Sequence, residues 1–225
     1  MVKDLETVTE MKYVIIKGFR DYGTMLALQE KTREEVLAGK HRGVIYFLEH
    51  APVYTSGLRG TEDQFLKPLN GVPVFNIRRG GELTWHGPGQ LVIYPVIDIR
   101  KGGFASIREF VNFFGTAIEK VISVHCGIKN AKWDEEKAGV WVDDRKIAFS
   151  GLHFRKFIPI HGYSVNISSD IKFFNSIVPC GMPDCRITSA AIETGKEFSV
   201  EEVSEKIVEI IKEKIPDLKK SKEDE

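Results

Sequence analysis

The sequence has few cysteines, no excess of charge and no long apolar run, and each absence excludes a class of protein. Three cysteines in 225 residues, an odd number, do not suit a disulfide framework and favour a reducing compartment. Lys plus Arg and Asp plus Glu both number 32, so the total charge gives no reason to expect nucleic-acid binding. No run of about 18 apolar residues suggests a membrane span, and the polar N-terminus does not resemble a signal peptide. We therefore expect a cytoplasmic protein.

The usual patterns of metal and cofactor sites are also missing. The six histidines form no HxxxH pair and no close cluster with cysteine, so we expect no metal. Cys180 and Cys185 do not have the CxxC spacing of redox motifs. The one glycine-rich stretch matches neither GxxxxGK[ST] nor a GxGxxG that opens a helix. We expect no cofactor.

What remains is an ordinary globular composition with interspersed strand and helix patterns. Hydrophobic residues make up 42% and charged residues 28%, which fits one domain over 1–225. Apolar periodicity predicts helices over 21–40 and 106–124 and a third that begins at the Ser199–Glu202 capping box. Strands are predicted over 13–18, 44–50, 72–79, 90–99 and 161–168, with a hairpin over 139–154. The pattern indicates an α/β (α+β) fold, a mixed β-sheet flanked by helices, and a charged tail over 219–225 that frays.

The most informative stretch is RRGGELTWHGPGQ, residues 78–90. Its four glycines permit unusual backbone conformations and a close approach of main-chain N–H groups to a ligand. Arg79 and His86 add polar side chains to this predicted loop. The alternative is a tight surface turn in which Gly and Pro only shape the chain, although Trp85 would be an unusual choice there. We expect the loop to contact a ligand.

Cys180 and Lys146 are the candidate reactive residues. Cys180 follows a proline and precedes a glycine in IVPCGM, a turn that can present a thiol to a cavity. Lys146 lies inside a predicted strand, where an ammonium directed inward would favour the thiolate of a nearby cysteine. An ordinary thiol is only about 3% ionised at pH 7, so such help matters. The plain alternatives are a small buried cysteine and a lysine on the exposed face of a hairpin.

Five segments together resemble the lipoyl(octanoyl) transferase family. They are LEHAPVYTSG, RGGELTWHGPGQ, GVWVDDRKIAFSGL, HGYSVNI and VPCGM, and the resemblance covers roughly residues 10–195 in order. It implies that Cys180 carries an acyl group as a thioester and that Lys146 activates it and moves protons. It also implies the fold of biotin and lipoate ligases, with a mixed sheet and helices on one side.

The resemblance further implies an acyl pocket built from three segments. The substrate-binding residues would be Arg79, Gly80, Gly81, Glu82, Leu83, Thr84, Trp85, His86, Phe149, Ser150, Gly151, Gly162, Tyr163 and Ser164. Phe149 and Ser150 depart from a segment that is commonly closer to Ala-Ile-Gly. Tyr163 and Ser164 replace the commoner Leu or Phe and Ala, so we expect these four positions to alter the shape of the pocket.

The implied reaction moves octanoyl from octanoyl-acyl carrier protein to a lysine of a lipoyl domain. The acceptors would be lipoyl domains of 2-oxoacid dehydrogenases or the glycine cleavage H protein. Three rivals remain. A lipoate–protein ligase would use ATP and usually carries Ser-Gly-Gly-Gly and His-Asp instead of Arg-Gly-Gly and His-Gly-Pro-Gly. An amidotransferase between lipoyl domains places its nucleophile elsewhere, and a binding protein without turnover would not need Cys180 and Lys146.

Overall fold

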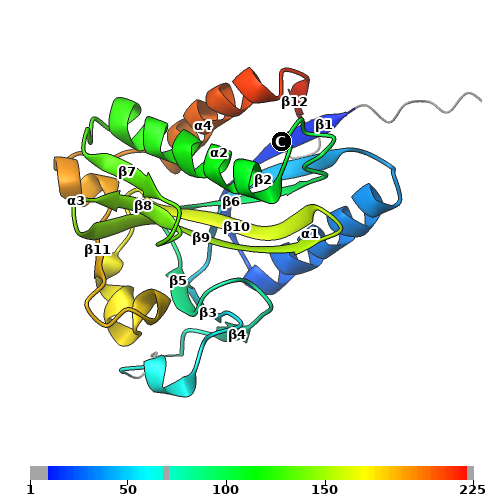
Figure 1. Cartoon of the computed structure of the whole chain (residues 1–225). Coiled ribbons are helices and arrows are strands. Elements are labelled where there is room, and N and C mark those ends of the chain that lie inside the picture. Colours follow the sequence, from blue (N-terminus) through cyan, green and yellow to red (C-terminus); the bar gives the residue numbers. More distant parts are fainter. Residues whose placement is uncertain (1–9, 68–70, 222–225) are drawn as a thin grey trace, which may run out of the picture.

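One large mixed sheet forms the centre of the computed structural model, which describes residues 10–67 and 71–221 (Figure 1). Its order is β12-β1-β2-β6-β10-β9-β8-β7, with β11 beside β9. The pairs β1–β2, β1–β12 and β9–β11 are parallel and the others antiparallel. The strands are β1 (Met11–Arg20), β2 (Gly43–His50), β6 (Gln90–Ile97), β7 (Ala131–Asp134), β8 (Gly139–Val142), β9 (Arg145–Arg155), β10 (Ile158–Asn166), β11 (Arg186–Ile187) and β12 (Leu218–Lys220).

Helices cover both faces of this sheet. α2 (Ile107–Lys120), which continues into the π-helical turn η2 (Val121–His125), packs with α4 (Val200–Lys214) on one face. α1 (Tyr22–Leu37) packs on the opposite face against β2, β6 and β10. The implied arrangement with helices on one side is therefore wrong for α1, although the mixed sheet with flanking helices is confirmed. β2 serves both faces because successive side chains alternate: Phe47 joins the core under α2 and α4, and Tyr46 joins the core under α1.

The helices begin where the sequence predicts them to begin. The side chains of Asp21, Ser106 and Ser199 each accept a hydrogen bond from a backbone N–H of the first turn, at 2.8, 3.0 and 3.4 Å. These N-caps satisfy donors that a helix start otherwise leaves free. The Asp21 cap fixes the start of α1 and so places Tyr22 in the first turn of the helix.

A smaller sheet of order β4-β3-β5 lies below the large one in Figure 1. Its strands are β3 (Val53–Ser56), β4 (Val74–Asn76) and β5 (Leu83–His86). Three short helices complete this layer, namely η1 (Glu62–Gln64), η3 (Ile171–Ser176) and η4 (Pro179–Gly181). A further helix, α3 (Ala190–Thr194), precedes α4. The expected loop over 78–90 thus contains a strand, because residues 83–86 pair with β3. The expected strand over 72–79 shrinks to three residues.

The C-terminal segment joins the sheet instead of fraying at residue 219. β12 pairs in parallel with β1, and Leu218 buries its side chain in the core under α4. The burial of Leu218 explains why this charged segment stays paired with the sheet. Residues 222–225 of the expected tail lie outside the described residues. Among residues 10–67 and 71–221, no helix is long and apolar enough to cross a membrane.

Candidate active site

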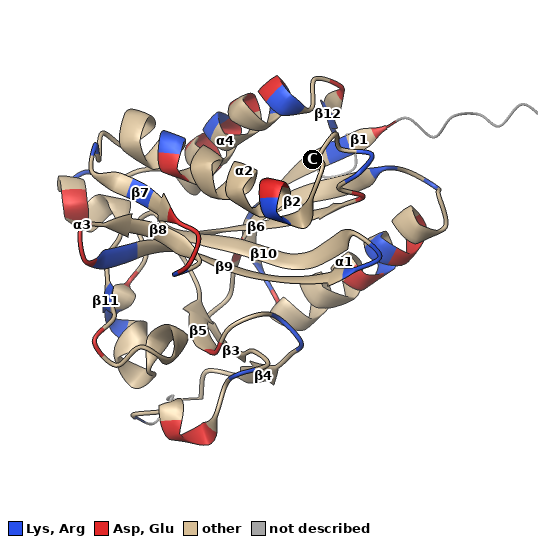
Figure 2. Ribbon diagram, viewed as in Figure 1, with Lys and Arg blue, Asp and Glu red and all other residues tan. Residues whose placement is uncertain are grey.

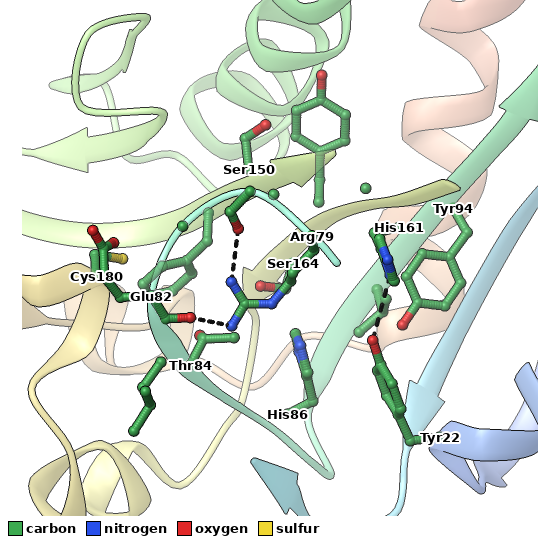
Figure 3. Close-up of a pocket in the computed structure, with 18 residues that line it drawn as sticks. Tyr22, Arg79, Glu82, Thr84, His86, Tyr94, Ser150, His161, Ser164 and Cys180 are labelled. Atoms are coloured by element: carbon green, nitrogen blue, oxygen red, sulfur yellow. Dashed lines mark hydrogen bonds between the residues drawn. The ribbon is translucent and has the colours of Figure 1, made fainter. Parts of the chain in front are cut away.

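A cavity lies between the small sheet and the face of the large sheet that carries α1. Its wall comes from the glycine-rich segment that leads into β5, from β6, β9 and β10, and from the first turn of α1. Figure 3 shows Cys180 at one end and Tyr22, Tyr94 and His161 at the other. Segments that are far apart in the sequence therefore line one pocket.

Cys180 sits at the mouth of this cavity in an unusual backbone conformation. It occupies the middle of η4 with φ 57° and ψ 22°, in the left-handed region that a side chain with Cβ adopts at a cost of about 1–2 kcal/mol. Pro179 is buried before it, and Gly181 follows with φ 65°. A strained residue at the end of a pocket is a common feature of functional sites.

Lys146 lies behind Cys180 because of a bulge in β9. Gly139 to Val140 of β8 pair with Phe149 to Ala148, but Trp141 pairs with Lys146, so Ile147 is an extra residue on β9. The bulge places the side chains of Lys146 and Phe149 on the same face, although they are three residues apart. Lys146 Nζ lies 3.7 Å from Cys180 Sγ and donates a 2.7 Å hydrogen bond to the Lys137 carbonyl.

The Lys146 ammonium is 2% exposed and has no carboxylate partner among the ion pairs of the described residues. Its Nζ lies 5.2 Å from the ring centres of Trp141 and Phe149. Aromatic faces stabilise a cation, but less than a paired anion does. Among the described residues, the side-chain hydrogen-bond partner of Lys146 Nζ is Cys180 Sγ, at 3.7 Å.

A second irregularity turns His161 into the cavity. His161 has φ 58°, and the regular pairing of β10 with β6 begins only at Tyr163. The backbone N–H of His161 donates instead to Gln29 Oε1 of α1 at 2.7 Å. His161 thus points toward Tyr22, whose hydroxyl lies 3.4 Å from its Nδ1.

Tyr163 points the other way. Its ring stacks on Phe114 of α2 at 5.7 Å, and its hydroxyl donates to the Val111 carbonyl at 3.1 Å. Only the main chain of Tyr163 therefore borders the cavity, and we do not expect this ring to set the shape of the pocket. Phe149, by contrast, stacks on Phe174 at 5.4 Å and does present its side chain on the pocket side.

Arg79 holds the glycine-rich segment in place. Its guanidinium donates to Thr55 Oγ1 at 2.9 Å and to the carbonyls of Thr55, Gly80 and Glu82 at 2.7, 2.8 and 2.6 Å. Burial lowers the pKa of this guanidinium, since all of these acceptors are neutral. The Glu82 side chain, 15% exposed, lies beside the Cys180–Gly181 turn, and its carboxylate pairs with Arg59 at 2.7 Å. Arg79 thus anchors the segment to β3 through four hydrogen bonds.

The inner end of the cavity is a set of buried, neutral polar rings. Burial lowers the pKa of His50 to about 4, and the pKa of His86 and of His161 to about 3. His50 donates from Nδ1 to the Arg20 carbonyl at 2.9 Å and accepts from the Tyr94 hydroxyl at 2.7 Å. The three imidazoles are therefore neutral at pH 7, and the positive charge of Arg79 further lowers the pKa of His86 and of His161.

The other two cysteines have different surroundings from Cys180. Burial raises the pKa of the Cys126 thiol to about 11 in the core under α4. Burial, with the nearby Cys180 as a second cause, raises the pKa of Cys185 to about 11 as well. All three cysteines are free. No group of three or more His, Cys, Asp or Glu side chains within residues 10–67 and 71–221 is placed to hold a metal.

The structure brings together nearly all of the residues that the sequence singled out. Thirteen of the predicted substrate-binding residues border the cavity together with Cys180, namely Arg79, Gly80, Gly81, Glu82, Leu83, Thr84, His86, Phe149, Ser150, Gly151, Gly162, Tyr163 and Ser164. Trp85 does not, because β5 alternates and turns its ring into the core between Phe173 and Phe174, at 4.9 and 5.8 Å.

Sequence reasoning missed four residues of the wall, which are Tyr22, Val92, Tyr94 and His161. The alternation of β6 pairs Val92 with Tyr94 on one face, and that signal was available. Tyr22 and His161 gave no comparable signal. The position of Tyr22 depends on the docking of α1, and that of His161 on a left-handed backbone conformation inside β10.

Comparisons with known proteins agree with this architecture. Residues 21–212 match the family model of the lipoyl protein ligase A/B catalytic domain. An octanoyltransferase of Mycolicibacterium gilvum is 37% identical over 94% of the chain and 88% of its own length. An octanoyltransferase of a Geobacter species is 35% identical over 84% and 90%.

Solved structures of lower identity share the fold. A putative lipoate protein ligase of Thermoplasma acidophilum with bound lipoic acid has a TM-score of 0.69 at 14% identity, over 94% of this chain and 89% of that one. A biotin protein ligase of Aquifex aeolicus has a TM-score of 0.55 at 14% identity, over 92% and 70%. The mixed sheet with its flanking helices is therefore a shared framework.

Proposed function

Because the chain belongs to the lipoyl protein ligase A/B catalytic domain family, we propose that it is an octanoyltransferase that works through an acyl-Cys180 thioester. The observation that carries the proposal is the contact of Lys146 Nζ with Cys180 Sγ, 3.7 Å apart at the mouth of the cavity. A nucleophile beside a proton-carrying group at the end of an apolar pocket suits acyl transfer. The donor would be octanoyl-acyl carrier protein, and the acceptor a lysine of a lipoyl domain.

In the first half-reaction the Cys180 thiolate attacks the carbonyl carbon of the octanoyl thioester. Lys146 takes up the proton of the Cys180 thiol, because its Nζ lies 3.7 Å from Sγ. A bond forms between Sγ and the acyl carbon, and the bond from that carbon to the sulfur of the carrier breaks. The departing sulfur takes a proton from Lys146. The same ammonium lies close enough to Sγ to stabilise the negative oxygen of the tetrahedral intermediate.

The acyl chain would extend from Cys180 along the cavity toward Tyr22 and His161. The buried side chains of Tyr22 and His161 at that end support a limit on chain length. Each buried methylene contributes about 0.8 kcal/mol, so chains much shorter than octanoyl lose affinity. Thr84 borders the cavity with a buried Oγ1 that has no hydrogen-bond partner among the described residues. We propose that this hydroxyl contacts the substrate.

In the second half-reaction the amine of a lipoyl-domain lysine attacks the acyl-Cys180 carbonyl. The new C–N bond replaces the C–Sγ bond, Cys180 leaves as a thiolate, and Lys146 takes up the proton that the amine loses. An amide is more stable than a thioester, so the reaction needs no ATP. Lipoyl domains of 2-oxoacid dehydrogenases and the glycine cleavage H protein are the acceptors we propose. The three free cysteines support our proposal of a reducing, cytoplasmic setting.

The transfer can be followed with purified octanoyl-acyl carrier protein and an unmodified lipoyl domain in the absence of ATP. We expect the wild-type chain to add one octanoyl group to the lipoyl-domain lysine, as measured by mass spectrometry, and the Cys180→Ala variant to add none. A requirement for ATP, with transfer retained by Cys180→Ala, would show a ligase instead.

A further inference from the structure

A second, open cavity of about 390 Å³ lies on the α1 side of the sheet and has a strongly basic wall. α1 supplies Arg33, the segment after β4 supplies Arg78, and β9 supplies His153 and Arg155. In Figure 2 both α1 and the segment after β4 carry blue positions. His161 borders this cavity as well as the candidate active site, so the two are neighbours.

Arg33 is the unusual member of this wall. It is 8% exposed, and its Nε and Nη1 are buried without any hydrogen-bond acceptor among the described residues. Nor does a carboxylate within residues 10–67 and 71–221 form an ion pair with it. Buried charges in proteins are normally paired and hydrogen-bonded, because desolvation otherwise costs several kcal/mol. A guanidinium with free donors on the wall of a cavity is suited to bind an anion.

The neighbouring charges reinforce this potential. His153 Nδ1 is also buried without a hydrogen-bond partner in the described part of the chain. Burial lowers the pKa of His153, and the nearby Arg33 and Arg78 lower it further, so positive charge concentrates here. Two carboxylates near the cavity oppose this positive charge. Glu34 is occupied by Arg155 at 2.6 Å, and Glu30 lies on the wall with an exposed side chain.

We propose that this cavity is a binding site for a phosphate group, held by Arg33 and Arg78 with His153 as a third donor. Donors from three different elements approach from several sides, and a tetrahedral phosphate can accept from all of them. The guanidinium fork matches two phosphate oxygens at once. The phosphate belongs to a free phosphorylated metabolite, because the acyl tail of the proposed donor points toward His161 and the pantetheine arm of that donor leaves the candidate active site at the opposite end, beside Cys180.

Inorganic phosphate is the probe for the site. The melting temperature of the wild-type chain is measured in increasing phosphate and in sodium chloride of matched ionic strength, because salt alone screens surface charges. Preferential binding to the folded state raises the melting temperature with phosphate. We expect Arg33→Gln to bind phosphate about 10-fold to 100-fold more weakly, the loss of a charged hydrogen bond.

Lys31→Gln is the matched control. It removes the same charge from the same helix, but Lys31 is exposed and does not border the cavity. It should bind phosphate as the wild type does. An equal response of wild type and Arg33→Gln, or no response specific to phosphate in the wild type, would overturn the proposal. If Arg33→Gln does not fold, Arg78→Gln, at an exposed position, gives the same test.

A kinetic comparison identifies the source of the phosphate and rests on the proposed function. Octanoyl-pantetheine and octanoyl-phosphopantetheine differ only in the phosphate. We expect Arg33→Gln to lose phosphate binding and to leave the preference between the two donors in kcat/KM unchanged. A wild-type preference for the phosphorylated donor that Arg33→Gln loses would place the donor arm here and overturn the assignment to a free metabolite. If neither donor acylates the chain, the proposed function fails while the phosphate-binding result is unaffected.

Discussion

Acid should unfold this protein in a pH range set by its three buried histidines. His50, His86 and His161 are neutral in the folded protein because burial lowers their pKa to about 4, 3 and 3. In the unfolded chain a histidine titrates near 6.5. Between these values the unfolded state binds more protons, so folding stability is complete above about pH 6.5 and falls as the pH drops toward 4.

The size of the effect follows from the gap between the two states. At pH 5 each histidine is about 1.5 units below its unfolded pKa and still mostly neutral when folded. At about 1.36 kcal/mol per unit this costs about 2 kcal/mol for each residue, or about 6 kcal/mol for all three. Paired carboxylates such as Glu193, whose pKa Arg145 lowers, destabilise the folded state only at more acidic pH. The free energies of unfolding are therefore compared at pH 5 and above, where these carboxylates do not contribute.

Urea unfolding at pH 7.5 and pH 5, with the free energy of unfolding extrapolated to water, measures this loss. The His86→Gln variant, which keeps a hydrogen-bonding side chain beside Gln90, should lose about one third of the pH dependence. A free energy of unfolding that is equal at the two pH values would refute the reasoning. So would folded-state titration of these three imidazoles near pH 6.5 in an NMR experiment.

Three further predictions concern the packing around the proposed nucleophile. Lys146→Met should slow acylation of Cys180 near neutral pH by about 10²–10⁴-fold, measured in rapid-quench experiments, without lowering the melting temperature. Gly139→Ala should slow acylation too, because a Cβ there would lie 2.3 Å from both Lys146 Cε and the Ala148 carbonyl oxygen and would displace β9 beside Lys146. In the Lys146→Met background it should add little to the loss of rate, whereas full additivity would contradict this account. Trp85→Ala should cost about 3–5 kcal/mol in urea unfolding, and a variant as stable as wild type would show that Trp85 is not a core residue.

Local chemistry in the sequence predicted much of the site. The Pro-Cys-Gly turn and the glycine-rich segment are visible because Pro and Gly restrict or free the backbone directly. Helix starts are visible for the same reason, since a single side chain such as Ser106 forms the cap. Resemblance to a family added the partners and the roles, which spacing alone does not supply.

What the sequence did not predict depends on long-range packing. Trp85 lies within the glycine-rich segment, and only the pairing of residues 83–86 with β3 shows that strand alternation turns its ring away from the cavity. Lys146 reaches its position through a bulge in β9, which shifts the side-chain alternation by one residue, and His161 through a left-handed backbone conformation within β10, with φ 58°. The buried guanidinium of Arg33 is likewise evident only after α1 packs on the sheet.

The central claim is that Cys180 carries the acyl group, and the intact mass of the protein tests it most directly. The chain is mixed with octanoyl-acyl carrier protein in the absence of acceptor, quenched in acid and measured, and the modified residue is located in a proteolytic digest. The account predicts one added octanoyl group on Cys180 in the wild type and none in Cys180→Ala. Equal labelling of the two proteins would contradict it.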